Sequence, residues 1–230
     1  MNTEITRLVI VPVDGSRIAL KSLGYLHTLY GTKHSLKIAL IYIMPALPPI
    51  LVDEAKRNRK TAKQLKTVEE KNVAMGHRIL EESQNYLVHK GFQTDAIDKL
   101  CEKKQSGIAR DISACIESRL SDALVVSSSG KGRLQGFFMG EVTNKLVEII
   151  RICPVWVVKG DVSHANVLIA VDGSTYSLRS VDHAGMVLCG TQSKIILFHA
   201  ERSVSRREEW NHHRPQSDTR TFSIDRLLLV

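Results

Sequence analysis

The tetrapeptide Val-Asp-Gly-Ser occurs twice in this chain, at residues 13–16 and again at residues 171–174. Each copy follows a short apolar run, and a similar sequence continues after each, so that Lys37–Ile41 parallels Lys194–Phe198. The distance between the copies is the length of a whole domain, far more than one unit of a solenoid. The repeat therefore indicates two copies of one fold.

Apolar runs alternate with helical patterns through the first copy. Runs without polar interruption are typical of strands buried on both faces, and strand–helix alternation predicts a parallel sheet with helices on both sides. The segment at 92–100 is more polar and is expected to lie at an edge. One long helix is expected from about residue 54 to residue 89. The sequence thus predicts an α/β fold with strands at about 8–13, 36–43, 92–100, 123–126 and 155–158.

The second copy is incomplete. A complete domain is predicted over residues 1–160, a strand–helix–strand unit over 161–200, and a disordered polar tail over 201–230. Half a domain leaves apolar faces and strand edges uncovered. We expect it to dock on the first domain, to pair between subunits, or to be poorly ordered. The loss of pattern after His199 would also fit a frameshifted or shortened tandem gene.

Composition excludes several classes of protein. The net charge is +8, but six of the basic residues lie within 56–66, a stretch that predicts the solvated start of a helix. It has no interleaved aromatic residues for base stacking, which argues against nucleic acid. The apolar runs are too short to cross a membrane, and the first residues show no export signal. Four cysteines without CxxC spacing predict reduced thiols in a cytoplasmic protein and no metal site.

Two segments carry candidate chemistry. Asp14 ends a buried strand, where open α/β sheets place ligand contacts; a turn residue or helix N-cap is the alternative. The glycine-rich segment 127–143 joins a strand to a helix, and such a loop with a helix N-terminus favours anions. A simple flexible connection is the alternative there. The segment fits neither a Walker A loop nor a dinucleotide fingerprint. Asp172 has no glycine loop after it and is predicted to be only a cap.

The segment reads Ser127-x2-Gly130-x9-Gly140-Glu141, and the chain continues with Val142-Thr143-Asn144-Lys145-Leu146. Together with Asp14 and Cys153–Val158, it resembles the universal stress protein family over about residues 5–160. The resemblance implies a doubly wound five-stranded parallel sheet of the Rossmann-like type and an ATP site. In that site Asp14 would approach the ribose, Pro12 and Val13 would line the adenine, and the amides of Gly130 and Gly140 would meet the phosphates. Ser127, Glu141 and Val142 complete the implied set.

Two residues depart from the family pattern. Ser127 replaces a glycine, and Glu141 replaces a serine or threonine that would donate to phosphate. Two unit charges about 4 Å apart repel by about 4 kcal/mol near a protein surface. Glu141 also suits the first turn of a helix, so we expect its carboxylate to occupy the anion position itself. Lys131 and Arg133 would offset this charge, which leaves weak nucleotide binding open.

The sequence shows no nucleophile–base pair with a recognisable spacing. We therefore expect a non-enzymatic stress-response or regulatory protein with a degenerate ATP loop and no assured cofactor. The alternative is an ATP-binding, nucleotide-dependent switch. A protein that acts only through interactions, as a homodimer or with another protein, would assemble through an edge strand at 154–158 or through the half domain.

Overall fold

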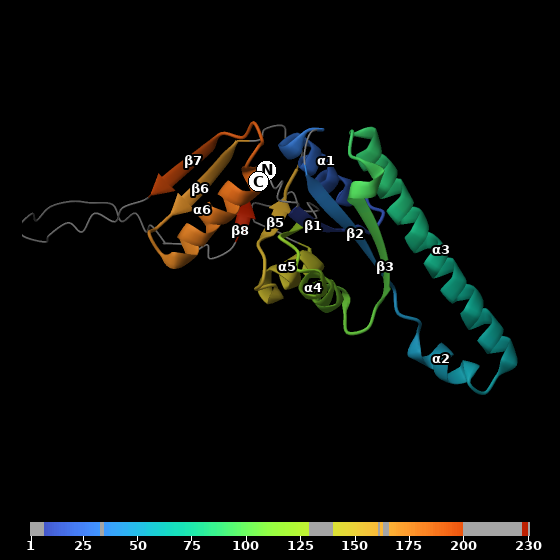
Figure 1. Ribbon diagram of the computed structural model, residues 1–230. Coiled ribbons are helices and arrows are strands. Elements are labelled where there is room, and N and C mark those ends of the chain that lie inside the picture. The colour runs from blue at the N-terminus through green and yellow to red at the C-terminus, as the bar shows by residue number, and fades with distance from the viewer. Residues whose placement is uncertain are drawn as a thin grey trace, which may run out of the picture.

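A computed structural model of the chain describes residues 7–32, 35–128, 140–160, 162, 166–199 and 227–229. Its centre is a six-stranded sheet in the order β3-β2-β1-β4-β5-β8, with every neighbouring pair parallel (Figure 1). The first five strands reproduce the predicted order of a doubly wound sheet. They are β1 (Arg7–Pro12), β2 (Leu36–Met44), β3 (Ile97–Lys103), β4 (Ala123–Ser127) and β5 (Val155–Val158).

Helices cover both faces of this sheet, as predicted. On one face, α1 (Ala19–Tyr30) and α3 (Arg59–His89) pack on alternate strand residues such as Val9 and Leu40. On the other face, α4 (Ile108–Arg119) and α5 (Glu141–Ile149) pack on the residues between them, such as Ile10 and Ile41. Side chains of a strand point alternately to the two faces, so strands that are apolar throughout supply both cores. The polar strand β3 lies at the edge of the sheet, as expected, but it begins at Ile97, after the short 3-10 helix η1 (Thr94–Ala96), and not at about residue 92.

The long helix expected from residue 54 to residue 89 is two helices. A short α2 (Pro49–Ala55) ends before residues 56–58, and α3 begins at Arg59 after the side chain of Asn58 accepts a hydrogen bond from the Lys60 amide. The first half of α3 contacts the sheet little. The apolar residues Val68 and Met75 are therefore 39% and 52% exposed, and most buried residues of α3 lie from Gly76 onward.

The strand–helix–strand unit is formed by β6 (Val167–Val171), α6 (Thr175–Leu188) and β7 (Ile195–His199). Its two strands make a separate parallel sheet. Of the three arrangements expected for a half domain, the structure shows docking on the first domain. The end of α6 lies against α1 and β5 with a gap of only about 10 Å³, lined by Tyr25, Leu29, Trp156, Val167, His183, Ala184, Val187 and Leu188.

Two expectations about the C-terminal part need correction. Residues 227–229, expected within a disordered tail, form the strand β8 (Leu227–Leu229). This strand pairs along β5, with Val155 opposite Leu227 and Val157 opposite Leu229. The outer edge of β5 is thus occupied, and the expectation of an open edge strand at 154–158 is wrong. Residues 200–226 lie outside the described residues. No helix in the described ranges is both long and apolar enough to cross a membrane.

Candidate functional site

The candidate site lies between β1 and β4, where the order of the strands in the sheet reverses. The chain leaves β1 toward α1 on one face and leaves β4 for α5 on the other. The ladder between these strands covers only Val9 with Ala123 and Ile10 with Leu124. Beyond this, β1 continues beside β2 and β4 continues beside β5. Their carboxyl ends are therefore unpaired with each other, which is where doubly wound sheets bind ligands.

On the β1 side, Asp14 is a turn residue with one oxygen still available. The Val13 amide donates to the Ile41 carbonyl at 2.9 Å and holds the strand end in place. Oδ1 of Asp14 accepts a hydrogen bond from the Ser16 amide at 2.9 Å, and Ser16 Oγ accepts one from the Ala19 amide at 3.1 Å. The side chain that accepts a hydrogen bond from the first residue of α1 is therefore that of Ser16 and not that of Asp14. Asp14 is exposed, and its Oδ2 has no hydrogen bond within the described ranges. Pro12 is half-buried beside it.

The second Val-Asp-Gly-Ser repeats this local arrangement. The Ser174 amide donates to Asp172 Oδ1 at 2.9 Å, and Ser174 is the N-cap of α6, accepting from the Ser177 amide at 3.2 Å. Hydrogen bonds from Ser174 and Ser177 lower the pKa of Asp172 to about 2. Asp172 is therefore a turn residue, and the expectation that it caps the helix is corrected to Ser174. In both copies, the tetrapeptide forms a turn whose serine accepts a hydrogen bond at the start of the following helix.

On the β4 side, hydroxyl groups link three elements. Ser127 Oγ lies 2.6 Å from Ser22 Oγ of α1, and Thr143 Oγ1 of α5 donates to the Ser127 carbonyl at 3.1 Å. Ser128 is 7% exposed, and its Oγ has no hydrogen-bond partner in the described part of the chain. The hydroxyl contacts of Ser22 and Thr143 and the burial of Ser128 were not expected from the sequence. The signal that the sequence offered is the position of Ser127 and Ser128 directly after an apolar strand.

The helix α5 begins at this end of β4 without a side-chain cap. Gly140 is its N-cap residue, and the first helical hydrogen bond runs from the Asn144 amide to the Gly140 carbonyl at 2.9 Å. Glu141 is exposed and Val142 is 39% exposed. Within the described ranges, the Glu141 carboxylate makes no hydrogen bond to the amides of this turn, and no side chain caps them. Uncapped amides at a helix start attract anions.

Some of the implied site cannot be placed. Gly130, Lys131 and Arg133 belong to 129–139, which is outside the described residues. The structure places Pro12, Val13 and Asp14 at the carboxyl end of β1, Ser127 at the carboxyl end of β4, and Gly140, Glu141 and Val142 at the start of α5. Within the described ranges, no group of three or more His, Cys, Asp or Glu side chains is arranged to hold a metal ion.

Comparison with known proteins agrees with the fold of the first domain. The sequence model of the universal stress protein family matches residues 6–159. The chain belongs to the universal stress protein family. Its family match ends before β6, so it covers the first domain and not the β6–α6–β7 unit of this universal stress protein. No curated protein sequence matches the chain.

Two solved structures show the same fold at low sequence identity. A universal stress protein from Archaeoglobus fulgidus DSM 4304 has a TM-score of 0.56 at 15% identity, covering 88% of this chain and 68% of its own. A hypothetical protein whose biochemical function was assigned from its structure has a TM-score of 0.51 at 20% identity, covering 69% and 99%. A universal stress protein in complex with cAMP has a TM-score of 0.46 at 16% identity, covering 67% and 97%.

Proposed function

We propose that this universal stress protein is a non-enzymatic regulatory protein that binds an adenine nucleotide between the carboxyl ends of β1 and β4. The observation that carries the proposal is the start of α5. It has no side-chain cap, and its Thr143 hydroxyl donates to the carbonyl of Ser127, the residue before Ser128, whose buried hydroxyl has no partner within the described ranges. Free amides with a helix dipole favour an anion such as phosphate, and a buried hydroxyl without a partner supplies a further donor.

Each candidate residue has a role that its placement allows. The amides of Gly140 and the first turn of α5 would donate to phosphate oxygens. Oδ2 of Asp14 would accept a hydrogen bond from a ribose hydroxyl, because its Oδ1 is already used by Ser16. Pro12 and Val13 would contact the base from the end of β1. The choice of ATP among anionic ligands rests on the family resemblance.

Glu141 weakens this site without filling it. Its carboxylate lies in the first turn of α5, so it adds negative charge close to the proposed phosphate position. Solvent screens an exposed carboxylate, and its cost falls below the ~4 kcal/mol of a close pair at the protein surface. We therefore expect weak binding by the natural chain, in line with a reversible, nucleotide-dependent switch.

A regulatory role without catalysis fits the reactive groups that the structure describes. Burial raises the pKa of Cys153 to about 11, and it also raises the pKa of Cys101 and Cys115 above the ordinary value for a thiol. These thiols stay protonated near neutral pH and are poor nucleophiles. We propose that the protein acts in the cytoplasm in a stress response. The second candidate is a protein that acts through contacts alone, which the exposed apolar strands β6 and β7 favour.

Titration with ATP tests the nucleotide site. Glu141→Ser removes the charge and restores a hydroxyl, so we expect it to tighten the ATP dissociation constant at least about tenfold, about 1.4 kcal/mol. Glu148→Ser is the matched control, because Glu148 is also exposed on α5 but lies in its last turn, paired with Lys145. Isothermal titration calorimetry measures all three proteins. Absence of ATP binding in both the natural chain and Glu141→Ser would overturn the proposal.

A further inference from the structure

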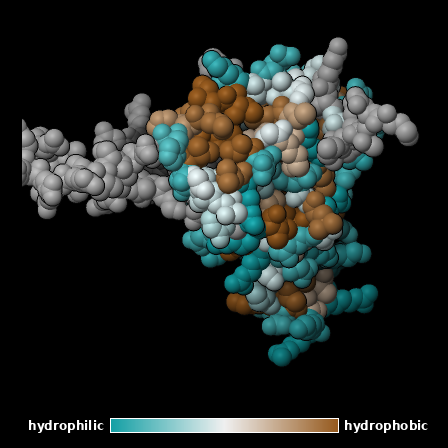
Figure 2. All heavy atoms as spheres, turned by 60° about the vertical axis from the view of Figure 1, so that its left-hand side comes forward, coloured by the Kyte–Doolittle hydropathy of each residue, from teal (hydrophilic) through white to brown (hydrophobic). Residues whose placement is uncertain are grey.

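Residues 45–66 form a hairpin that projects from the first domain. It consists of the chain after β2, the short helix α2, the turn at 56–58 and the start of α3. In Figure 1 this hairpin extends below the sheet, on the side away from the β6–α6–β7 unit. Figure 2 shows mostly hydrophilic side chains at the lower end of the molecule, with a few hydrophobic ones among them. We call these residues the α2–α3 hairpin.

The first limb of the α2–α3 hairpin is apolar but exposed. All residues from Met44 to Val52 are apolar, and of these only Met44 is buried. The helix α2 has no buried residue, and its Ile50 and Leu51 are 73% and 37% exposed. Single exposed apolar residues are ordinary, but a run of them marks a surface that contacts another molecule.

The second limb is strongly basic. Six basic residues follow α2 without an acidic residue between them: Lys56, Arg57, Arg59, Lys60, Lys63 and Lys66. Against Asp53 and Glu54 they give the hairpin a net charge of +4, which is half of the chain's net charge of +8. Lys56 pairs with Asp53, and Lys66 lies 4.0 Å from Glu70. The other four basic residues have no ion pair within the described ranges.

The position of these charges does not help the helix that carries them. Arg59 and Lys60 lie in the first turn of α3, which has no acidic residue. The positive end of a helix dipole disfavours cations there. Lys63 and Lys66 continue at one-turn spacing from Arg59, so like charges share one face and repel each other. An anionic surface against this face would remove both penalties.

We propose that the α2–α3 hairpin binds the surface of a membrane that contains anionic phospholipids. Ile50 and Leu51 would enter the boundary between headgroups and acyl chains, and the basic side chains would contact lipid phosphates. A cluster of about four to eight Lys and Arg beside an amphipathic helix is what such surfaces attract. A helix is only about 10–12 Å across, so the long basic side chains of α3 can reach headgroups around the apolar limb.

The apolar limb favours lipid over the other polyanions. Residues 45–66 contain no aromatic side chain that could stack on a base, and nucleic acid phosphates offer no place for exposed Ile50 and Leu51. A folded acidic protein needs roughly 800 Å² of complementary surface on each partner. A narrow, projecting hairpin fits that requirement poorly, whereas a fluid lipid surface adapts to its shape. This binding goes beyond nucleotide binding and does not depend on it.

The physics of the contact sets its strength. Each basic residue close to an anionic membrane raises the partition coefficient roughly fivefold. The attraction falls off over about 8 Å at physiological salt, so only residues of the hairpin contribute to it. We therefore expect reversible, salt-dependent binding to one side of the bilayer.

Co-sedimentation of the full chain with lipid vesicles tests the proposal. We expect binding to phosphatidylcholine vesicles that contain about one third phosphatidylserine, and little binding to pure phosphatidylcholine or at high salt. Lys60→Gln with Lys63→Gln should lower the partition coefficient at least about tenfold. The matched control is Lys37→Gln with Lys194→Gln, which removes the same charge from exposed lysines outside the hairpin. That variant should bind like the natural chain.

Ile50→Gln separates lipid from other polyanions. Because Ile50 is 73% exposed, the change leaves the fold intact, and it should weaken vesicle binding at least about threefold. Binding to a DNA or RNA duplex would not depend on this side chain. Ile152→Gln is the control, because Ile152 is 56% exposed and lies outside the hairpin. Circular dichroism checks that each variant folds.

Three results would overturn the proposal. The first is a natural chain that does not bind the anionic vesicles at low salt. The second is vesicle binding that the folded Lys60→Gln/Lys63→Gln and Ile50→Gln variants leave unchanged, because the contact would then lie elsewhere. The third is tighter binding to a nucleic acid duplex than to vesicles, unaffected by Ile50→Gln, which would assign the basic residues to nucleic acid phosphates.

Discussion

At the scale of single residues, buried hydroxyl groups hold the candidate site together. Thr143 is 7% exposed and donates from α5 to the backbone carbonyl of Ser127, while Ser127 meets Ser22 of α1. A buried polar group that loses its partner is costly, so these contacts fix the two helices relative to the end of β4. An equivalent bond on an exposed surface competes with water and contributes little.

Thr143→Val tests this difference. Valine keeps the shape but leaves the Ser127 carbonyl without its donor, so we expect the free energy of unfolding to fall by about 1–2 kcal/mol. Thr67→Val is the control, because Thr67 makes a bond of the same 3.1 Å length to the Lys63 carbonyl on an exposed face of α3. We expect that change to stay within about 0.5 kcal/mol. Denaturant unfolding measures both, and equal losses would contradict the argument.

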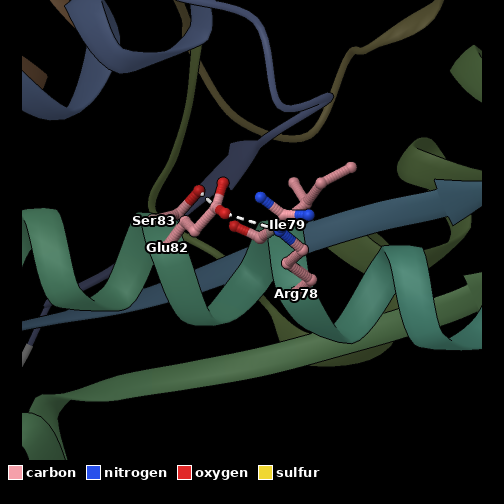
Figure 3. Close-up of polar contacts among 4 residues, drawn as sticks. All are labelled: Arg78, Ile79, Glu82 and Ser83. Carbon is pink, nitrogen blue, oxygen red and sulfur yellow. Dashed lines mark hydrogen bonds and ion pairs between the residues drawn. The ribbon is translucent and has the colours of Figure 1, made fainter.

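At the scale of elements, the exposed and buried sides of α3 contribute differently to stability. Figure 3 shows Arg78 and Glu82 paired along the helix, while the Ser83 hydroxyl turns back to the Ile79 carbonyl. The Arg78–Glu82 pair is exposed, so solvent screens it and its contribution to stability is small. The buried side contributes far more, because there α3 packs against the sheet. A glycine, Gly76, makes that close approach feasible.

Gly76→Ala tests how closely α3 lies on the sheet. A Cβ at Gly76 would come within 2.6 Å of Cys101 Sγ and 2.8 Å of the Tyr42 ring. Overpacking of this kind costs about 1–3 kcal/mol, which exceeds the ~1 kcal/mol that alanine gains over glycine in a helix. We expect a net loss of stability in thermal unfolding.

Gly185→Ala is the matched change, because nothing lies within 4 Å of a Cβ at this helical glycine of α6. We expect it to be neutral or to stabilise by up to about 1 kcal/mol. A Gly76→Ala variant as stable as Gly185→Ala would show that α3 can move away from β2 and β3 without cost.

At the scale of the whole molecule, a hydrogen bond between two side chains joins the first domain to the β6–α6–β7 unit. The Trp156 indole of β5 donates to His183 Nε2 of α6 at 3.3 Å, and the two rings meet edge to face at 5.9 Å. Only a neutral imidazole can accept this bond. Burial lowers the pKa of His183 to about 4, against a smaller opposing effect from Asp122. The docking of α6 therefore depends on an uncharged histidine.

This dependence predicts how stability changes with pH. The unfolded chain binds a proton at His183 near its ordinary pKa of about 6.5, and the folded chain does so only near 4. Stability from this group is therefore complete above about pH 6.5 and falls as the pH drops toward 4. Between pH 7 and pH 5 the loss should be about 2 kcal/mol.

His183→Gln gives the comparison for this prediction. The glutamine carbonyl can accept the indole bond but does not titrate, so the variant should lose less stability between pH 7 and pH 5 than the natural chain. The free energy of unfolding at each pH measures the difference. An identical pH dependence in the two proteins would show that His183 is charged or undocked in the folded state.

Much of the fold could be predicted because it follows from short-range patterns. The apolar runs and helical spacings indicated the strands and helices of the first domain, and the polarity of 92–100 placed β3 at the edge. The Asp-Gly-Ser turns also depend on atoms only a few residues apart, such as the Ser16 amide and Asp14. The break at 56–58 was missed because its basic residues fit a solvated helix as well as a turn.

The membership of the candidate site stays a prediction, whereas parts of its local geometry can be compared with the sequence. The sequence placed Asp14 and Gly140 at strand and helix ends, because a strand–turn–helix pattern is local. It could not show that Glu141 points to solvent or that Thr143 bonds to the Ser127 carbonyl. Those outcomes depend on how α5 lies across β4, which is set by packing between distant segments.

The sequence by itself thus determined the alternation of strands and helices in the first domain and the family, but not the helix break at 56–58 or the strand β8. Only the tertiary structure decided that β8 pairs with β5, that α6 docks through Trp156 and His183, and that Ile196 and Phe198 remain exposed. The physical reason is how far apart along the chain the interacting residues lie. Hydrogen bonds and periodicity within a segment are properties of neighbouring residues, whereas pairing, docking and exposure depend on which surfaces meet after the chain has folded.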